Sequence, residues 1–183
     1  MTESNVRKDF VMPVAVLTII CLVMASLLAF TNGVTAPIIE KAEKQAAQQA
    51  RLEVLPQAAN FERVDIDPEK LPPSVTDVYK ATNDTGYAVS VDGDGYGGKK
   101  TLKMIVGVDE NGFITDTKVM SHSETPGLGS KVTEPDFKDQ FNGLDESGLD
   151  GIVTISGATI SSNHYIDTVR DALTAVEIAK EAE

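Results

Sequence analysis

Residues 102–119 read LKMIVGVDENGFITDTKV, and this stretch decides which kind of fold to expect. Apolar side chains alternate with others in two runs, 102–108 and 113–119, which flank Asp109-Glu110-Asn111-Gly112. A period of two is typical of a strand with one buried face. The intervening residues supply turn chemistry, with a glycine that accepts positive φ. The stretch therefore predicts an antiparallel β-hairpin.

Strand and helix patterns lie on both sides of this hairpin. The period of two also occurs at 78–81 and 87–91, and 152–155 is a short apolar run that we interpret as a further strand. Apolar residues at Ile166, Val169, Leu173 and Val176 have helical spacing and predict a helix over about 162–181. A short acidic helix or turn is expected at 135–141, and a loop at 143–151. The fold class is α+β, with a mixed, mainly antiparallel sheet flanked by helices.

Charge is distributed unevenly along the 183 residues. No charged side chain occurs from Phe10 to Ile39, whereas the remaining positions carry all 16 Lys and Arg and all 28 Asp and Glu. The apolar run 11–30 matches a hydrocarbon core of about 30 Å at about 1.5 Å per residue. A cleaved signal peptide has a shorter apolar core of about 7–15 residues. We therefore expect one transmembrane helix over 10–31.

The segment after this span is rich in Ala, Gln and Glu. Residues 38–55 have a weak apolar stripe at helical spacing, and Pro56 is a stop signal. Two interpretations stay open: a solvated stalk helix, or a helix that lies against a membrane partner. Residues 60–74 are polar with three prolines, which is typical of a linker or of the entrance to a domain. We expect a stalk and linker over 32–74 and a globular domain over 75–183.

Composition excludes several classes of function. The net charge is −12, which disfavours nucleic acid and anionic lipid headgroups as partners. The chain has two His, and its one Cys, Cys21, lies in the predicted span. No Cys/His nucleophile pair or Cys/His zinc cluster is therefore expected in the domain, and no metal site. Redox chemistry in this domain has to come from a cofactor.

The most informative motif is Thr154-Ile155-Ser156-Gly157-Ala158-Thr159-Ile160-Ser161-Ser162. It joins the last predicted strand to the C-terminal helix. The free N–H groups and positive dipole end of a helix start favour an anion, usually a phosphate. Gly157 and Ala158 would let a ligand approach, and Thr159 offers a hydroxyl. The alternative is that Ser and Thr serve here as ordinary helix N-caps.

Two further loops contain special residues. His122-Ser123-Glu124-Thr125-Pro126-Gly127-Leu128-Gly129-Ser130-Lys131 could wrap a flat ligand and bond its polar edge, or could be a plain turn. Asp92-Gly93-Asp94-Gly95-Tyr96-Gly97-Gly98 has calcium-like composition, but Tyr96 and Lys103 stand where an EF-hand loop needs ligands. We interpret this loop as flexible, with one aromatic side chain, Tyr96.

In combination, these features resemble a known family. The N-terminal span, Gly95-Tyr96-Gly97-Gly98, the segment from Glu124 to Gly129, and Ser156-Gly157-Ala158-Thr159-Ile160-Ser161 occur in one order. They look like the G subunit of the Rnf ion-translocating ferredoxin:NAD oxidoreductase, a relative of the C subunit of the sodium-translocating NADH:quinone reductase. The resemblance covers nearly the whole chain.

The resemblance implies a cofactor and a set of site residues. FMN would be attached through a phosphoester to Thr159 by a separate flavin transferase. The expected flavin contacts are Tyr96, Glu124, Thr125, Gly127, Leu128, Gly129, Ser156, Gly157 and Ala158, with Thr125 and Leu128 close to the isoalloxazine ring. Family members often have an acidic residue six positions before the acceptor, where this chain has Val153.

The resemblance also implies a location and partners. Residues 1–9 would be a cytoplasmic tail, the span would lie in the cell membrane, and the FMN-binding domain at 75–183 would be extracytoplasmic. Other membrane subunits of the complex would exchange electrons with it. The alternatives are the C subunit of the quinone reductase, an anchored binding or assembly module without flavin, and an anchored flavoprotein reductase for a soluble substrate.

Overall fold

The computed structural model describes residues 10–182, so the predicted tail at 1–9 lies outside the described residues. The chain divides into two compact units, Met1–Gln45 and Ala46–Glu183. The first helix, α2 (Met12–Val54), runs without a break through Pro37. Within the described residues, it is the one helix long and apolar enough to cross a membrane, and its large apolar side chains from Met12 to Ile39 are exposed. This helix is a candidate membrane anchor.

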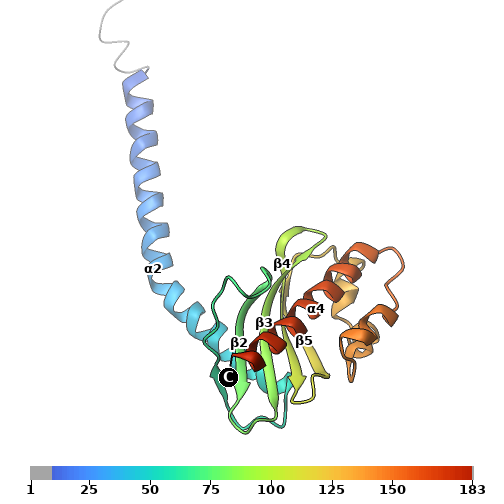
Figure 1. The fold of residues 1–183 in the computed structure, drawn as a ribbon. Coiled ribbons are helices and arrows are strands. Elements are labelled where there is room, and N and C mark those ends of the chain that lie inside the picture. Colours follow the sequence, from blue (N-terminus) through green and yellow to red (C-terminus); the bar gives the residue numbers. More distant parts are fainter. Residues whose placement is uncertain (1–9, 183) are drawn as a thin grey trace, which may run out of the picture. The chain divides into compact units, whose positions relative to one another are not determined.

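The second unit is built on a five-stranded antiparallel sheet (Figure 1). The strands are β1 (Phe61–Arg63), β2 (Val75–Ala81), β3 (Gly86–Gly95), β4 (Gly98–Asp109) and β5 (Ile114–His122), and their spatial order follows the chain. The hairpin predicted from 102–119 is confirmed, since β4 pairs with β5. At its turn, Asp109 Oδ1 accepts the N–H groups of Asn111 and Phe113, and Gly112 has φ +91°.

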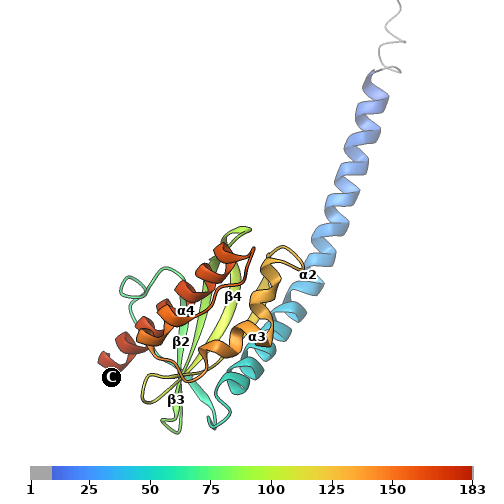
Figure 2. The ribbon, with the colours of Figure 1, turned by 90° about the vertical axis from the view of Figure 1, so that its right-hand side faces the viewer.

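The two faces of the sheet are covered by different helices. Helix α4 (Thr159–Glu181) lies across one face, and the last turns of α2 lie on the other (Figure 2). The alternation of side chains along β3 decides which residue faces which helix: Val89 and Val91 pack with α4, whereas Ala88 packs with α2. The predicted fold class, an antiparallel sheet flanked by helices after an apolar N-terminal helix, is confirmed.

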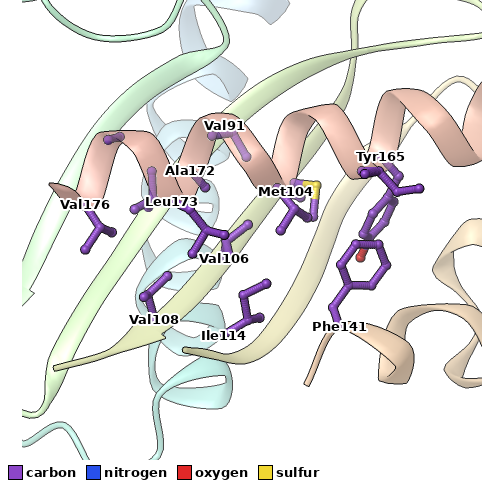
Figure 3. Close-up of a cluster of buried hydrophobic side chains, with 14 of the residues drawn as sticks. Val91, Met104, Val106, Val108, Ile114, Phe141, Tyr165, Ala172, Leu173 and Val176 are labelled. Atoms are coloured by element: carbon purple, nitrogen blue, oxygen red, sulfur yellow. The ribbon is translucent and has the colours of Figure 1, made fainter. Parts of the chain in front are cut away.

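The main core lies between α4 and the sheet (Figure 3). Side chains from β3, β4 and β5 meet Ala172, Leu173 and Val176 of α4. Toward the beginning of α4, three aromatic rings pack together: Phe137, Phe141 and Tyr165, with centroids 5.1–5.5 Å apart. Phe137 and Phe141 come from α3 (Pro135–Lys138) and η3 (Asp139–Phe141), so the helix expected around 135–141 is confirmed.

Tyr165 is the largest fully buried side chain of this cluster. Its hydroxyl shares a hydrogen bond of 2.7 Å with Thr117 Oγ1, which is also fully buried. Burial raises the pKa of the Tyr165 phenol well above its usual range, and the bond to Thr117 opposes only part of that shift. The core therefore includes one satisfied polar pair.

The end of α2 packs closely against the opposite face of the sheet. Ala50 and Val54 are buried against Ala88 and Ile105. A Cβ on Gly107 of β4 would overlap the Val54 carbonyl oxygen, so only glycine leaves room for the helix end here. The Thr115 hydroxyl donates to the same carbonyl.

Polar contacts from two more residues of α2 extend this packing. The Arg51 guanidinium lies 3.5 Å from the centroid of the Tyr79 ring, a cation–π geometry. Lys118 Nζ is 2.7 Å from Glu53 Oε2. Residues 46–54 are therefore part of the globular unit, and neither a wholly solvated stalk nor a helix reserved for a partner describes them. The expected functional division at residue 75 stays a prediction.

Four local expectations are wrong. Residues 152–155 form no strand: Gln140 bonds both backbone groups of Val153 at 2.9 and 3.3 Å, and Ser162 Oγ accepts the Ile155 N–H at 3.1 Å. Side chains, and not a neighbouring strand, thus form hydrogen bonds with the backbone of Val153 and Ile155. Residues 60–74 contain β1, so the linker interpretation of this segment is wrong and it is the entrance to the domain. Residues 146–151 of the expected loop form the 3₁₀ helix η4 (Glu146–Gly151). The loop at 92–98 is the tip of the β3–β4 hairpin, with Gly95 paired to Gly98.

Candidate functional site

A cavity of about 310 Å³ lies where three segments of the second unit meet. The segments are the β3–β4 tip, the loop at 122–131 and the first turn of α4. The lining residues are Tyr96, Thr125, Leu128, Gly129, Gly157, Ala158, Thr159, Ile160 and Ser161. The structure thus brings together the motifs that the sequence presented as three separate loops. The volume is near the lower end of ligand pockets, which span about 300–1,000 Å³.

The first wall is the start of α4. Gly157 has φ +81°, which favours glycine, and the Ala158 N–H donates to the Ile155 carbonyl at 2.9 Å. Ala158 is the buried N-cap residue, and Thr159 is the exposed first residue of the helix. The first N–H groups of a helix have no acceptor within it, and the dipole there attracts negative charge. This wall has the chemistry of an anion site with a hydroxyl beside it.

The alternative interpretation of this motif as side-chain N-caps is wrong. The N-cap residue of α4 is Ala158, and no side-chain cap hydrogen bond is made there. The Ser161 hydroxyl donates to Glu124 Oε2 at 2.5 Å, and the Ser162 hydroxyl donates to the Ala158 carbonyl at 3.0 Å. The helix also starts at Thr159, three positions before the predicted residue 162. The serines therefore hold neighbouring segments instead of capping α4.

The second wall is a tight loop. The Leu128 and Ser130 N–H groups both donate to the Thr125 carbonyl at 3.2 Å, and the Gly127 N–H donates to Ser130 Oγ at 2.9 Å. Gly127 has φ +73°, and the chain then enters the short helix η2 (Gly129–Thr133). These bonds leave the Leu128 side chain outside the turn and 45% exposed. Leu128 Cδ1 would be 3.3 Å from a Cβ on Gly157, so the two walls nearly touch.

The rim of the cavity is apolar. Tyr96 is 65% exposed, Ile160 54% and Leu128 45%, in a domain whose other large apolar side chains are mostly buried. Tyr96 stands at the hairpin tip and adds the third wall. An apolar rim beside the amides of a helix start suits a ligand that has a flat apolar part and an anionic group.

Glu124 lies behind these walls. It is 5% exposed, and the cavity lining does not include it. Its Oε1 accepts the Tyr96 N–H at 2.8 Å, and its Oε2 accepts the Ser161 hydroxyl. The structure therefore directs both carboxylate oxygens to protein groups, whereas the sequence suggested that they bond a ligand.

The other predicted site residues fall into two groups. Tyr96, Thr125, Leu128, Gly129, Gly157, Ala158 and Thr159 line the cavity. Gly127 and Ser156 adjoin it in the chain but are not lining residues. Sequence reasoning missed Ile160 and Ser161 as lining residues. Their position in the sequence was a signal for them. Ile160 and Ser161 directly follow Thr159, so all three lie in the first turn of the helix and near the same helix end.

Comparison with known proteins defines the class to which this site belongs. Residues 95–174, which include every lining residue, match the family model described as FMN-binding domain. FMN combines a flat isoalloxazine ring with a phosphate, and the apolar rim and the helix start are suited to these two parts. The second unit therefore carries an FMN-binding domain.

Two relatives specify the family. The chain is 32% identical to the G subunit of the ion-translocating oxidoreductase complex of Methanosarcina acetivorans, over 91% of this chain and 94% of the relative. It is 34% identical to the G subunit of the Na(+)-translocating ferredoxin:NAD(+) oxidoreductase complex of Acetobacterium woodii, over 84% of this chain and 78% of the relative. The chain belongs to the family of G subunits of ion-translocating oxidoreductase complexes.

One solved structure is also similar. It is the C subunit of the Na(+)-translocating NADH-quinone reductase from Parabacteroides distasonis, with 24% identity and a TM-score of 0.44. The match covers 57% of this chain and 61% of the other.

Proposed function

We propose that the chain is a membrane-anchored electron carrier in an Rnf-type ferredoxin:NAD oxidoreductase, with FMN attached covalently to Thr159. The observation that carries this proposal is the position of Thr159. It is an exposed hydroxyl residue at the first position of α4, and it lines a cavity whose other walls come from two further motifs. A phosphate esterified to this hydroxyl would lie beside the free amides of the helix start.

The residues around Thr159 would hold the remainder of the flavin. Gly157 and Ala158 place only small groups next to the phosphate position, and Tyr96, Thr125 and Leu128 offer surface to the ring. The backbone beside the site would be shaped by Ser156 in the segment before α4, and by Gly127 and Gly129 in the loop at 122–131. When bound, FMN supplies electron acceptance and donation, which no side chain of this domain offers. The protein binds and orients the group, and the ester prevents its dissociation.

The membrane anchor would determine the side of the membrane on which the FMN-binding domain lies. We propose that α2 spans the cell membrane once, with residues 1–9 in the cytoplasm and the FMN-binding domain outside. A cofactor that can dissociate would be lost there, which favours a covalent link. Electron transfer requires neighbouring cofactors, so other subunits of the complex are the partners. A flavin transferase would attach the FMN.

The test is to co-express the full chain with a flavin transferase and examine it after denaturation. We expect a fluorescent flavin band that stays with the chain, and an intact mass increased by one FMN less one water. Thr159→Ala should abolish both signals. Thr154→Ala is the matched control, because it removes a threonine hydroxyl from the same segment, and it should retain the flavin.

Two results would contradict the proposal. A flavin band that persists in Thr159→Ala would place the link elsewhere. A wild-type chain that carries no flavin under these conditions would favour the alternative of an anchored module without cofactor.

A further inference from the structure

We propose that Glu124 is a positioning residue that holds the three walls of the cavity together from behind and places a negative charge under the flavin site. This inference rests on the proposed function for the identity of the ligand. The geometry that carries it concerns the protein alone.

The first argument is the set of bonds that Glu124 makes. Its Oε1 accepts the backbone N–H of Tyr96 at 2.8 Å, 28 positions away in sequence. Its Oε2 accepts the hydroxyl of Ser161 at 2.5 Å, 37 positions away. One side chain from the loop at 122–131 thus fixes the hairpin tip and the first turn of α4. Tyr96 and Ser161 both line the cavity, so Glu124 acts on the ligand through them.

The second argument is that the backbone is shaped around this carboxylate. A Cβ on Gly95 would overlap Oε1, and a Cβ on Gly129 would overlap Oε2. Neither glycine has the positive φ that would by itself favour glycine, so space is the reason for both. Two glycines from different walls therefore leave the volume that Glu124 occupies.

The third argument is electrostatic. Burial of a carboxylate is unfavourable unless hydrogen bonds compensate it, and both oxygens of Glu124 have such bonds. The carboxylate lies next to Gly129 and Ser161, and both of these residues line the cavity. Coulomb repulsion at this range makes added electrons on a bound flavin less favourable. Glu124 should therefore lower the reduction potential of the site.

The first experiment uses the full chain in detergent, produced without flavin transferase. Hydrogen exchange of the Tyr96 amide is measured by NMR in wild type, Glu124→Ala and Glu124→Gln. Glu124→Ala removes the acceptor and should speed exchange about tenfold, as expected for the loss of one hydrogen bond of about 1.4 kcal/mol. Glu124→Gln keeps an acceptor oxygen and should restore slow exchange. Glu134→Gln, an exposed glutamate close by in the chain, is the matched control.

An unchanged Tyr96 amide in folded Glu124→Ala would overturn the positioning role. If Glu124→Ala does not fold, Ser161→Ala provides the second variant. It removes one of the two bonds and should alter the resonances of Glu124 and Tyr96. Unchanged resonances at these two residues would equally overturn the role.

The second experiment measures the reduction potential of the flavin-loaded chain. Glu124→Gln should raise the potential, while Glu134→Gln leaves it unchanged. A purely structural role would not predict this shift, because Gln preserves the size of the side chain. Equal potentials in wild type and Glu124→Gln would overturn the electrostatic part. If wild type takes up no flavin, the proposed function fails, and the exchange experiment still tests Glu124.

Discussion

The two faces of the sheet are held by different kinds of interaction. On the α4 face, aliphatic and aromatic side chains from the sheet, from α4 and from the short helices between them form one large buried cluster. On the α2 face, the buried apolar cluster consists of Ala50, Val54, Ala88 and Ile105, with Ala47 and Phe61 at its edge. Two further kinds of contact hold α2 on this face. Its backbone approaches that of β4 closely at Gly107, and Arg51 and Glu53 make polar contacts with the sheet.

This difference has a consequence for how each helix responds to change. A large buried apolar area holds α4 on the sheet. The hydrophobic effect is non-directional, so no single contact fixes the position of this helix. The position of the α2 end depends on close fit at a few points. We therefore expect the α4 face to dominate the stability of the domain and the α2 face to be sensitive to single backbone changes.

The largest effect is expected from a cavity in the α4 face. Phe141→Ala should lower the free energy of unfolding by about 3–5 kcal/mol, because Phe141 is fully buried between Phe137 and Tyr165. Urea unfolding of the full chain in detergent, followed by tyrosine fluorescence, measures it. Phe113→Ala is the control, since Phe113 is 42% exposed, and should lose less than about 1 kcal/mol. Equal losses in both variants would contradict the importance of this cluster.

A smaller effect is expected on the α2 face. Gly107→Ala should lower the free energy of unfolding by about 1–3 kcal/mol, because the new methyl group displaces the Val54 carbonyl. It should also speed hydrogen exchange of the Leu55 amide, which bonds the Arg51 carbonyl at the end of α2. Gly151→Ala adds a methyl group in open space and is the control. Unchanged exchange at Leu55 would show that α2 does not depend on this close approach.

The smallest effect concerns the buried polar pair of Tyr165 and Thr117. Tyr165→Phe removes the bond to Thr117 and should lower the free energy of unfolding by about 1 kcal/mol at neutral pH. Tyr96→Phe, at an exposed position, should change it little. The same urea series in both variants provides the comparison.

The pH dependence of this pair follows from the raised pKa of Tyr165. Above pH about 10 the unfolded chain releases the phenolic proton while the folded chain retains it, so wild-type stability falls as pH rises. The loss due to this group is about 1.4 kcal/mol at about pH 11. Tyr165→Phe lacks this contribution, so its disadvantage should vanish there. A constant difference between the two proteins from pH 7 to about 11 would contradict the raised pKa.

Local patterns predicted the elements whose hydrogen bonds are local. The β4–β5 hairpin follows from alternation and turn residues that lie within one short stretch. Helix α4 follows from its apolar spacing, although it begins earlier than that spacing indicated. The strand prediction for residues 152–155 was wrong. The sequence pattern of a short apolar run is the same whether its backbone forms hydrogen bonds with a neighbouring strand or with side chains. Here the partners are Gln140 and Ser162, which no local pattern specifies.

The sequence by itself determined the apolar span, the hairpin and the apolar face of the C-terminal helix. Each of these depends on neighbours a few positions away, so composition and spacing are enough. The tertiary structure decided that the three motifs share one cavity, that Glu124 faces Tyr96 and Ser161, and that α2 ends against Gly107. These contacts join residues 28 to 53 positions apart, and only the packing of the sheet with its two helices brings them together.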